Sequence, residues 1–363
     1  MPGSSIGQRL VLTSFGESHG ICVGTVLDGC PAGLEIDEND IQKMLDLRKP
    51  GQSLVSTQRK EEDKVEILSG IFRGYTTGAP IAMIIWNADH DSRAYEQLRT
   101  KMRPGHSDYP ALIKYKKFND FRGGGRFSGR LTATHVMGGA IARKLLKITL
   151  GIETNSYTLQ IGKIRMSKVT QQMMKMIYSN EVRCPDKKTA KKMRDIILAA
   201  RKKGDSLGGV IESVTTNLPV GLGEPIFGSL ESDLGKALYS IPAVKGIEFG
   251  SGFAGAETFG SLNNDPYMIK DGKIVTKTNN SGGILGGLSN GMPIVLRIAF
   301  KPASSILKKQ TTVDIKTKKP TSLQVTGRHD PCVVPRAPPV VDSLVSLVLA
   351  DHALQGGFIK PVL

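Results

Sequence analysis

Three of the six histidines stand in turns built from glycine, proline and arginine. They are His19 in Gly16–Gly20 (GESHG), His106 in Arg103–Asp108 (RPGHSD) and His329 in Gly327–Cys332 (GRHDPC). An imidazole can pass a proton near neutral pH, and glycine lets a backbone approach a ligand closely. One such turn is explained well enough as an ordinary capped turn with an incidental histidine. Three of them favour a catalytic site carried on loops.

Other loops, rich in glycine and other small residues, contain cationic and hydroxyl side chains. Arg122–Arg130 (RGGGRFSGR) puts three guanidiniums on a glycine loop directly before a predicted helix. Backbone N–H groups and a helix N-terminus favour anions, and arginine binds phosphate or carboxylate through two N–H groups. Lys301–Ser305 (KPASS) and Asn280–Gly287 (NSGGILGG) add further hydrogen-bonding turns. Together these loops predict a cleft for a compact polyanion.

The charge balance agrees with an anionic partner but does not identify it. The chain has 363 residues, with 49 Lys and Arg against 33 Asp and Glu, and a formal charge of +16. Such a field attracts nucleic acid, an anionic membrane or a phosphorylated metabolite. The sequence shows no signal peptide, no apolar run long enough to span a bilayer and no CxxC pair. We therefore expect a cytoplasmic protein without a metal site.

Three motif matches have simpler explanations. Gly250–Gly255 fits the dinucleotide pattern GxGxxG, but Asn263–Pro266 excludes the long helix that must follow it. Ser305 and Lys308 fit SxxK without the accompanying motifs of that enzyme class. The lysines of Lys187–Lys203 are typical of a solvated helix face, because no aromatic residues are interleaved.

Apolar spacing and caps predict the elements that hold these loops. Four helices are expected: one capped by Asp37, then 131–150, 185–203, and one capped by Asp342. Strands are expected at 9–13, 21–27, 64–68, 81–86, 209–216 and 293–300. The elements do not alternate as βαβ units, which argues against a doubly wound parallel sheet. Thr77–Ile81 (TGAPI) resembles Asn290–Ile294 (NGMPI), and each segment leads into an expected strand. The similarity indicates either two related halves of the chain or a chance match.

Many ordered motifs resemble the chorismate synthase family nearly end to end. They include Phe15–Gly20, Arg48–Gly51, Gln58-Arg59, Arg103–Asp108, Arg122–Arg126, Gly221–Pro225, Ala243–Gly246, Gly282–Gly287, Lys301-Pro302, Gly327–Cys332 and Pro335–Ala337.

This resemblance implies a reaction, a cofactor and a fold. The reaction is the 1,4-anti-elimination of phosphate from 5-enolpyruvylshikimate 3-phosphate to give chorismate, and it requires reduced FMN (FMNH2) although there is no net redox change. The implied fold is α+β, a layered sandwich with helices between two mainly antiparallel sheets, formed by a single domain over 1–363. The implied assembly is a homotetramer that binds neither nucleic acid nor membrane.

Roles for individual residues also come from the resemblance. His19 protonates the departing phosphate, His106 helps hold the charge state of the reduced flavin, and Asp330 assists proton removal. The substrate clamps are Arg48, Arg130 and Arg336. The FMN contacts are Arg126, Phe127, Ser128, Gly286, Lys301, Pro302, Ala303, Ser304, Ser305 and Arg328.

The chain departs from the family pattern at three positions. Phe127 and Leu131 replace a hydroxyl and a carboxylate residue, and Leu54 replaces a common arginine. The family is linked to FAD and NADP, but this chain has no dinucleotide fingerprint. We therefore expect an enzyme whose flavin is reduced by an external flavin reductase. The residues alone leave two rivals, a nucleic-acid-binding protein and a different flavoprotein or phospho-sugar lyase.

Overall fold

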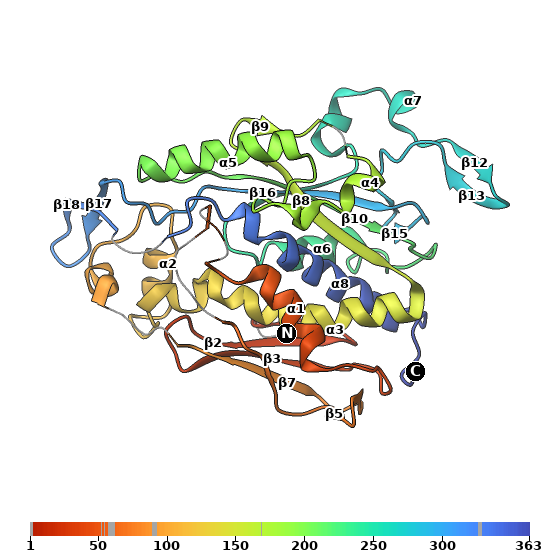
Figure 1. The fold of residues 1–363 in the computed structure, drawn as a ribbon, viewed down its shortest axis with the longest axis horizontal. Helices are drawn as coiled ribbons and strands as arrows, with labels where there is room; N and C mark the ends of the chain where they lie inside the picture. The colour runs from red at the N-terminus through yellow and green to blue at the C-terminus, as the bar shows by residue number, and fades with distance from the viewer. Residues whose placement is uncertain are drawn as a thin grey trace.

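Two five-stranded sheets face each other across a layer of helices (Figure 1). The computed structural model describes residues 3–51, 53, 55–56, 62–88, 93–167, 169–325 and 329–363. The first sheet has the order β1 (Ser5–Ile6), β2 (Val11–Gly16), β3 (Cys22–Asp28), β7 (Ile81–Trp86), β4 (Glu66–Ile67). The second has the order β11 (Val244–Phe249), β16 (Ile294–Phe300), β10 (Gly209–Thr216), β8 (Glu153–Ile161), β9 (Ile164–Arg165). All neighbouring strands in these sheets are antiparallel, so the predicted α+β sandwich is confirmed.

The inner layer holds the helices α1 (Glu38–Arg48), α3 (Thr132–Leu150), α6 (Leu230–Leu238) and α8 (Pro338–Gln355) (Figure 1). The amphipathic α5 (Lys187–Lys202) lies on the outer side of the second sheet. Asp37 caps α1 by accepting from the Asp40 N–H, and Gly151 ends α3 with φ of +67°, both as predicted. Within the described residues, no helix has the length and apolar character needed to cross a membrane.

The predicted start of the last helix is wrong. Asp342 does not cap α8, because the helix begins four residues earlier at Pro338 and Pro339. Proline suits the first helical turn, where its missing N–H removes no hydrogen bond. The Asp342 carboxylate instead lies inside the helix layer and accepts from Arg143 Nη1 of α3 at 3.0 Å.

Short elements complete the chain. The small helices are α2 (Asp108–Lys114), α4 (Gln171–Met174) and α7 (Gly260–Asn263). Single 3-10 turns cover 93–99, 122–127, 129–131, 177–179, 252–257 and 334–336. The hairpins are β5 (Ile71–Phe72) with β6 (Tyr75–Thr76), β12 (Tyr267–Lys270) with β13 (Lys273–Thr276), β14 (Ile284–Leu285) with β15 (Leu288–Ser289), and β17 (Gln310–Asp314) with β18 (Lys319–Leu323). No long helix follows Gly250–Gly255, in keeping with the turn predicted there.

The two halves of the chain repeat one topology. The first half runs β2, β3, α1, β4, β7, α3, and the second runs β8, β10, α6, β11, β16, α8. In space the strands lie in the order β2-β3-β7-β4 and β8-β10-β16-β11, which is the same arrangement. The two similar segments noted in the sequence enter the equivalent strands β7 and β16, and each turns at a glycine, Gly78 or Gly291, with φ near +85°. The repeat therefore favours two related halves over chance.

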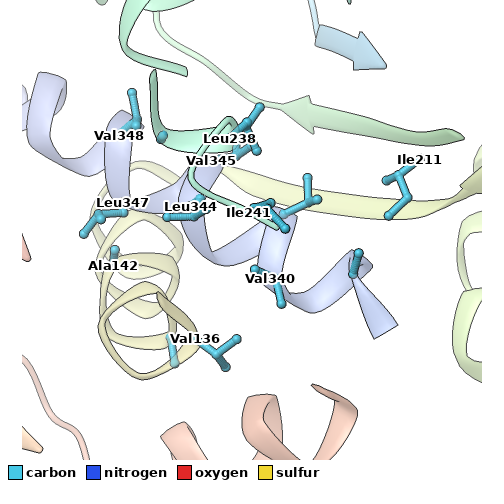
Figure 2. Close-up of a cluster of buried hydrophobic side chains, with 14 of the residues drawn as sticks. Val136, Ala142, Ile211, Leu238, Ile241, Val340, Leu344, Val345, Leu347 and Val348 are labelled. Atoms are coloured by element: carbon cyan, nitrogen blue, oxygen red, sulfur yellow. The ribbon is translucent and has the colours of Figure 1, made fainter. Parts of the chain in front are cut away.

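The halves meet where α3 packs on α8, and one hydrophobic core runs through both (Figure 2). Val136 and Ala142 of α3 lie beside a row of apolar residues on α8 that includes Leu344 and Leu347. The two helices approach closely because a Cβ at Gly139 would lie only 2.2 Å from the Ser343 Cβ. This contact fixes the helices that carry the loops described next.

Candidate active site

A cavity of about 720 Å³ opens where equivalent segments of the two halves meet. The first half contributes the C-terminal end of α1 and the connection from β7 to α3, which includes Tyr95 to Arg130. The second half contributes the link from α6 to β11 and the connection from β16 to α8, which includes Lys301 to Arg336. This volume lies within the range of about 300–1,000 Å³ that small-molecule sites occupy.

The walls of the cavity are strongly cationic. Seven of the described lining residues are arginine or lysine, and Asp330 is the single carboxylate among them. The seven are Arg48, Arg103, Arg126, Arg130, Lys245, Lys301 and Arg336. A concave site with one sign of charge concentrates ligands of the opposite sign.

His19 lies behind the cavity wall, on the turn between β2 and β3. Its side chain is buried, its Nδ1 is 3.2 Å from the Ser18 hydroxyl, and its ring meets the Tyr95 ring edge-on at 5.0 Å. A Cβ on Gly123 would lie 2.1 Å from the imidazole, so only glycine lets the loop approach it. Gly123 and Tyr95 both line the cavity, so His19 lies directly behind residues that form its wall.

Asn87 joins the His19 turn to an arginine of the wall. Its amide nitrogen donates to the Glu17 and Gly20 carbonyls at 3.0 and 2.9 Å, which fixes both ends of the turn. Its amide oxygen accepts from Arg130 Nε at 3.0 Å. The Asn87 side chain therefore fixes the position of the His19 turn relative to Arg130.

His106 stands in a network of charged groups at the start of α2. Its Nδ1 is 2.6 Å from Asp108 Oδ1, and Arg103 donates to both oxygens of the same carboxylate. Burial raises the pKa of Asp108, but the hydrogen bonds from Arg103 and His106 outweigh it and hold this pKa well below its usual range. The ring edge of His106 lies 3.5–3.6 Å from where a Cβ on Gly124 would stand.

Arg48 and Arg130 share one fully buried carboxylate, that of Asp63. Arg48 Nη1 donates to Asp63 Oδ2 at 2.7 Å, and Arg130 Nη1 donates to Asp63 Oδ1. Burial raises the pKa of Asp63, but the two guanidiniums outweigh it and hold the pKa below the ordinary carboxylate value. Arg48 also donates to the Thr132 hydroxyl at 3.1 Å and to the Gly129 carbonyl at 2.8 Å. Both arginines are therefore fixed before any ligand arrives.

Asp330 and Arg336 form an ion pair in the wall contributed by the second half. Arg336 Nη1 donates to Asp330 Oδ2 at 2.6 Å, and Arg336 Nε reaches the Arg48 carbonyl at 3.3 Å. The second contact brings the connection before α8 against the end of α1. Three predicted substrate arginines thus lie around one space.

The Lys301–Ser305 loop provides a cation and two hydroxyls. Lys301 Nζ donates to Ser304 Oγ at 2.7 Å, and Ser304 donates onward to the Gly105 carbonyl at 2.7 Å. Ser305 accepts from Arg103 Nη1 at 3.0 Å, which ties this loop to the His106 network. Burial, followed by the nearby Lys245 charge, lowers the pKa of Lys301.

The predicted flavin contacts at 126–128 differ in where their side chains lie. Arg126 lines the cavity, but its guanidinium donates to the Gly16 and Ser14 carbonyls and to the Ser4 hydroxyl. Ser128 accepts from the Arg130 N–H at 3.3 Å and so starts the turn before α3. Phe127 is 38% exposed at the cavity and offers an apolar face.

Most of the predicted site residues gather here, and three of those that the structure describes do not line the cavity. Ala303 lines it, whereas Pro302 does not. His19 is the buried neighbour described above. Gly286 lies in the turn between β14 and β15. The next residue in this turn, Gly287, lies beside Gly223 and Ser229. Arg328, like Leu54, Gln58 and Arg59, falls outside the described residues.

Sequence reasoning missed several residues that organise the site. Asp108 lies within a quoted motif, yet no pattern singles out its carboxylate as the partner of His106. Asp63 follows two glutamates and is indistinguishable in sequence from a surface carboxylate. Lys245 belongs to the Ala243–Gly246 segment, and the family resemblance of that segment is the only feature of the sequence that points to this lysine.

Comparison with known proteins identifies the family. The family model described as chorismate synthase matches residues 10–354. The chain is 52% identical over 361 residues to a chorismate synthase of Dehalococcoides mccartyi, with 99% of each chain covered. It is also 52% identical over 356 residues to one of Korarchaeum cryptofilum, with 98% of each covered.

A solved structure agrees over the same extent. A crystal structure of chorismate synthase superposes with a TM-score of 0.77 at 31% identity, and the match covers 96% of this chain and 93% of that one. Sequence and fold thus agree from end to end, and the chain belongs to the chorismate synthase family.

Proposed function

We propose that this cavity is where the lyase eliminates phosphate from 5-enolpyruvylshikimate 3-phosphate to give chorismate. The observation that carries the proposal is the wall of seven cations with two imidazoles, His106 and His329, and one carboxylate. The substrate has two carboxylates and a phosphate monoester, roughly four negative charges near neutrality. Its charge and compact size match this wall better than an extended nucleic acid does.

The three clamp arginines hold the substrate's anionic groups. Arg48 and Arg130 together with Asp63 carry a net single positive charge, so they bind an anion with little rearrangement. Arg336 is paired with Asp330 until an anionic group of the substrate competes for its guanidinium. That exchange makes the Asp330 carboxylate available to assist removal of the ring proton when substrate binds.

His19 is the general acid for the departing phosphate. Phosphate is a poor leaving group unless its developing charge is neutralised by a proton and by cations. The imidazole is buried beside Gly123, held at Nδ1 by Ser18 and confined by the Tyr95 ring. Asn87 connects the His19 turn to Arg130, so the proton donor and this cation lie on the same side of the cavity.

The residues present fit reduced FMN as well as substrate. Lys301, Lys245 and the hydroxyls of Ser304 and Ser305 suit a phosphate group, and Phe127 offers a face to a flat ring. We assign the flavin to this side of the cavity, with Arg126, Ser128 and Ala303 beside it and Pro302, Gly286 and Arg328 added by resemblance. When bound, reduced FMN supplies transient electron density to the breaking bond. His106 helps to hold the charge that this electron-rich cofactor carries.

The working form is a homotetramer of a single-domain chain. The core includes residues from Leu10 to Ile359, which supports one domain. The β12–β13 hairpin extends from one end of the molecule and exposes Tyr267, Ile269 and Ile274 to solvent (Figure 1). Apolar side chains gathered on an extended hairpin favour contact with another copy of the chain.

An anaerobic assay with three reactions tests the function and the source of electrons. Phosphate release is measured with chemically reduced FMN, with oxidised FMN, and with oxidised FMN plus NADPH. We expect turnover only in the first, because an external flavin reductase supplies the reduced cofactor. Turnover independent of FMN would contradict the proposed function. Equal rates in the first and third reactions would show that the chain reduces its own flavin.

A variant assigns the chemistry to this cavity. His19→Ala should lower kcat on the order of 10²–10⁴-fold, the contribution of a general acid. The matched control is His352→Ala, which removes a histidine paired with Asp233 away from the cavity. Normal turnover in His19→Ala with an unchanged melting temperature would remove His19 from the mechanism.

A further inference from the structure

The Asp108 carboxylate receives donors from two side chains and has both oxygens engaged. Oδ2 accepts from the Arg103 backbone N–H at 3.0 Å and from Arg103 Nε at 2.8 Å. Oδ1 accepts from Arg103 Nη2 at 2.7 Å and lies 2.6 Å from His106 Nδ1. Arg103 and Asp108 are largely buried, so these contacts are shielded from competing water.

This arrangement decides which ring nitrogen of His106 carries a proton. An ionised carboxylate can only accept hydrogen bonds, so the 2.6 Å contact with Asp108 Oδ1 is favourable when His106 Nδ1 carries a proton. The guanidinium of Arg103 also lies 3.1 Å from Nδ1 and, having donors only, would need Nδ1 as its acceptor, so it competes with Asp108 for this atom. The contact with the charged carboxylate is the shorter of the two and decides the tautomer. A neutral His106 therefore carries its proton on Nδ1, and Nε2 holds the lone pair.

Nε2 is the atom that the cavity can reach. His106 lines the cavity, and because its Nδ1 contacts Asp108 and Arg103, Nε2 is the ring nitrogen left for a ligand. The Cε1–Nε2 edge of the ring lies 3.5–3.6 Å from where a Cβ on Gly124 would stand. Gly124 has φ of +86°, a conformation that glycine adopts without strain. The turn thus holds Nδ1 against Asp108 and leaves Nε2 as the nitrogen available to a ligand in the cavity.

Arg103 connects this pair to the loop assigned to the flavin. Its Nη1 donates to Ser305 Oγ at 3.0 Å, while Nε and Nη2 hold Asp108. The orientation of His106 is therefore tied to the position of the Lys301–Ser305 loop through one rigid guanidinium.

We infer that Asp108 is a positioning residue, which fixes His106 as the Nδ1–H tautomer and leaves Nε2 as the ring nitrogen that a ligand in the cavity can reach. The inference rests on the proposed function for the role of His106 in turnover. The tautomer itself is a property of the resting protein and is measured without substrate.

The first test reads the tautomer directly. Long-range proton–nitrogen NMR spectra of protein labelled at histidine distinguish a protonated from an unprotonated ring nitrogen, and the chain has only six histidines. His106→Gln assigns the signals. At a pH where the ring is neutral, we expect Nδ1 protonated and Nε2 unprotonated. The opposite pattern would overturn the inference without any variant of Asp108.

The second test removes the charge of Asp108 while keeping its shape. In Asp108→Asn the neutral amide lacks the negative charge that holds the proton on His106 Nδ1. The ring should then move towards the Nε2–H tautomer, and kcat should fall on the order of 10²-fold, as when an outer partner of a catalytic histidine is lost. Asp205→Asn, which alters an exposed pair with Lys308, should change neither.

The outcomes separate this inference from the proposed function. An unchanged tautomer and unchanged kcat in Asp108→Asn would overturn the positioning role. Normal turnover in His106→Gln, together with the Nδ1–H tautomer in the parent protein, would remove His106 from the mechanism and leave the assignment of the tautomer intact.

Discussion

Gly123 determines at the residue scale whether His19 can stay in its place. Its φ is +57°, and a Cβ there would stand 2.1 Å from the imidazole. Gly123→Ala should therefore displace His19 and lower kcat on the order of 10²-fold or more, through loss of the proposed general acid. Gly74→Ala is the control, because Gly74 also has positive φ but nothing lies within 4 Å of its Cβ position. Steady-state rates at equal folded fractions check this, and equal kcat in both variants would contradict it.

Asp63 is the second residue on which the site depends. Asp63→Asn leaves two buried guanidiniums without their shared counter-ion, a loss typically worth about 3–5 kcal/mol of unfolding free energy. The pKa of Asp63 is held below its unfolded value, so its stabilisation is present above the unfolded pKa and disappears as the pH falls. Urea unfolding at neutral and acidic pH measures both effects.

The control for Asp63 is an exposed pair. Asp46→Asn alters a solvent-exposed contact with Lys49 at 2.9 Å and should cost less than about 1 kcal/mol. A similar small loss in Asp63→Asn would show that Arg48 and Arg130 do not need their common carboxylate.

The crossing of α3 and α8 is the feature that matters most at the element scale. A Cβ at Gly139 would stand 2.2 Å from Ser343 Cβ and 2.5 Å from its Cα, so Gly139→Ala must push the helices apart. We expect a loss of about 1–3 kcal/mol in unfolding free energy, despite the better helix propensity of alanine. Gly235→Ala in α6 has no atom within 4 Å and should instead gain up to about 1 kcal/mol. Thermal unfolding of both variants tests this, and a stabilising Gly139→Ala would contradict the close approach.

Asp342 gives the same helix pair a pH dependence. Burial raises the pKa of Asp342 to about 6, although Arg143 opposes the rise. The folded state therefore binds a proton more tightly than the unfolded state, and this group's contribution to stability increases as the pH falls from about 6 towards 4.

Comparison with Asp342→Asn isolates that contribution. Relative to the variant, the parent protein should gain roughly 2–3 kcal/mol of unfolding free energy between pH 7 and pH 4. Denaturant unfolding at several pH values measures it. A difference that is constant with pH, or that falls in acid, would contradict the raised pKa.

The elements that could be predicted from the sequence are those with local signals. Asp37 and Gly151 mark helix ends through caps that involve only nearby backbone, and β7 and β10 have long apolar or alternating runs. β8 was missed because polar residues such as Ser156 and Thr158 occupy buried positions on it. The histidine and arginine loops were recognisable for the same local reason. Asp63 and Asp108 were not, because a carboxylate's partner depends on which chain segments fold against it.

At the scale of the whole molecule, the β12–β13 hairpin is the surface to test. Ile269 and Ile274 pair across its strands, with 69% and 67% of their surface exposed. Ile269→Ser combined with Ile274→Ser should shift the assembly from the proposed tetramer to smaller species in light scattering, with the secondary structure unchanged. Lys270→Ser on the same hairpin is the polar control. A variant with the parent's mass would exclude this hairpin from the interface.

The repeated topology has a mechanical consequence for the cavity. Arg130 stands two residues before α3, and Arg336 stands two residues before α8, so the two proposed clamps occupy equivalent places at the starts of two helices that cross. Helices are stiff, and their packing permits few relative positions. The distance between the two helix starts is therefore set by the buried crossing at Gly139 and Ser343, while contacts with loop residues orient the two guanidiniums. The preference for a substrate whose anionic groups are a certain distance apart would therefore depend on the buried crossing of α3 and α8.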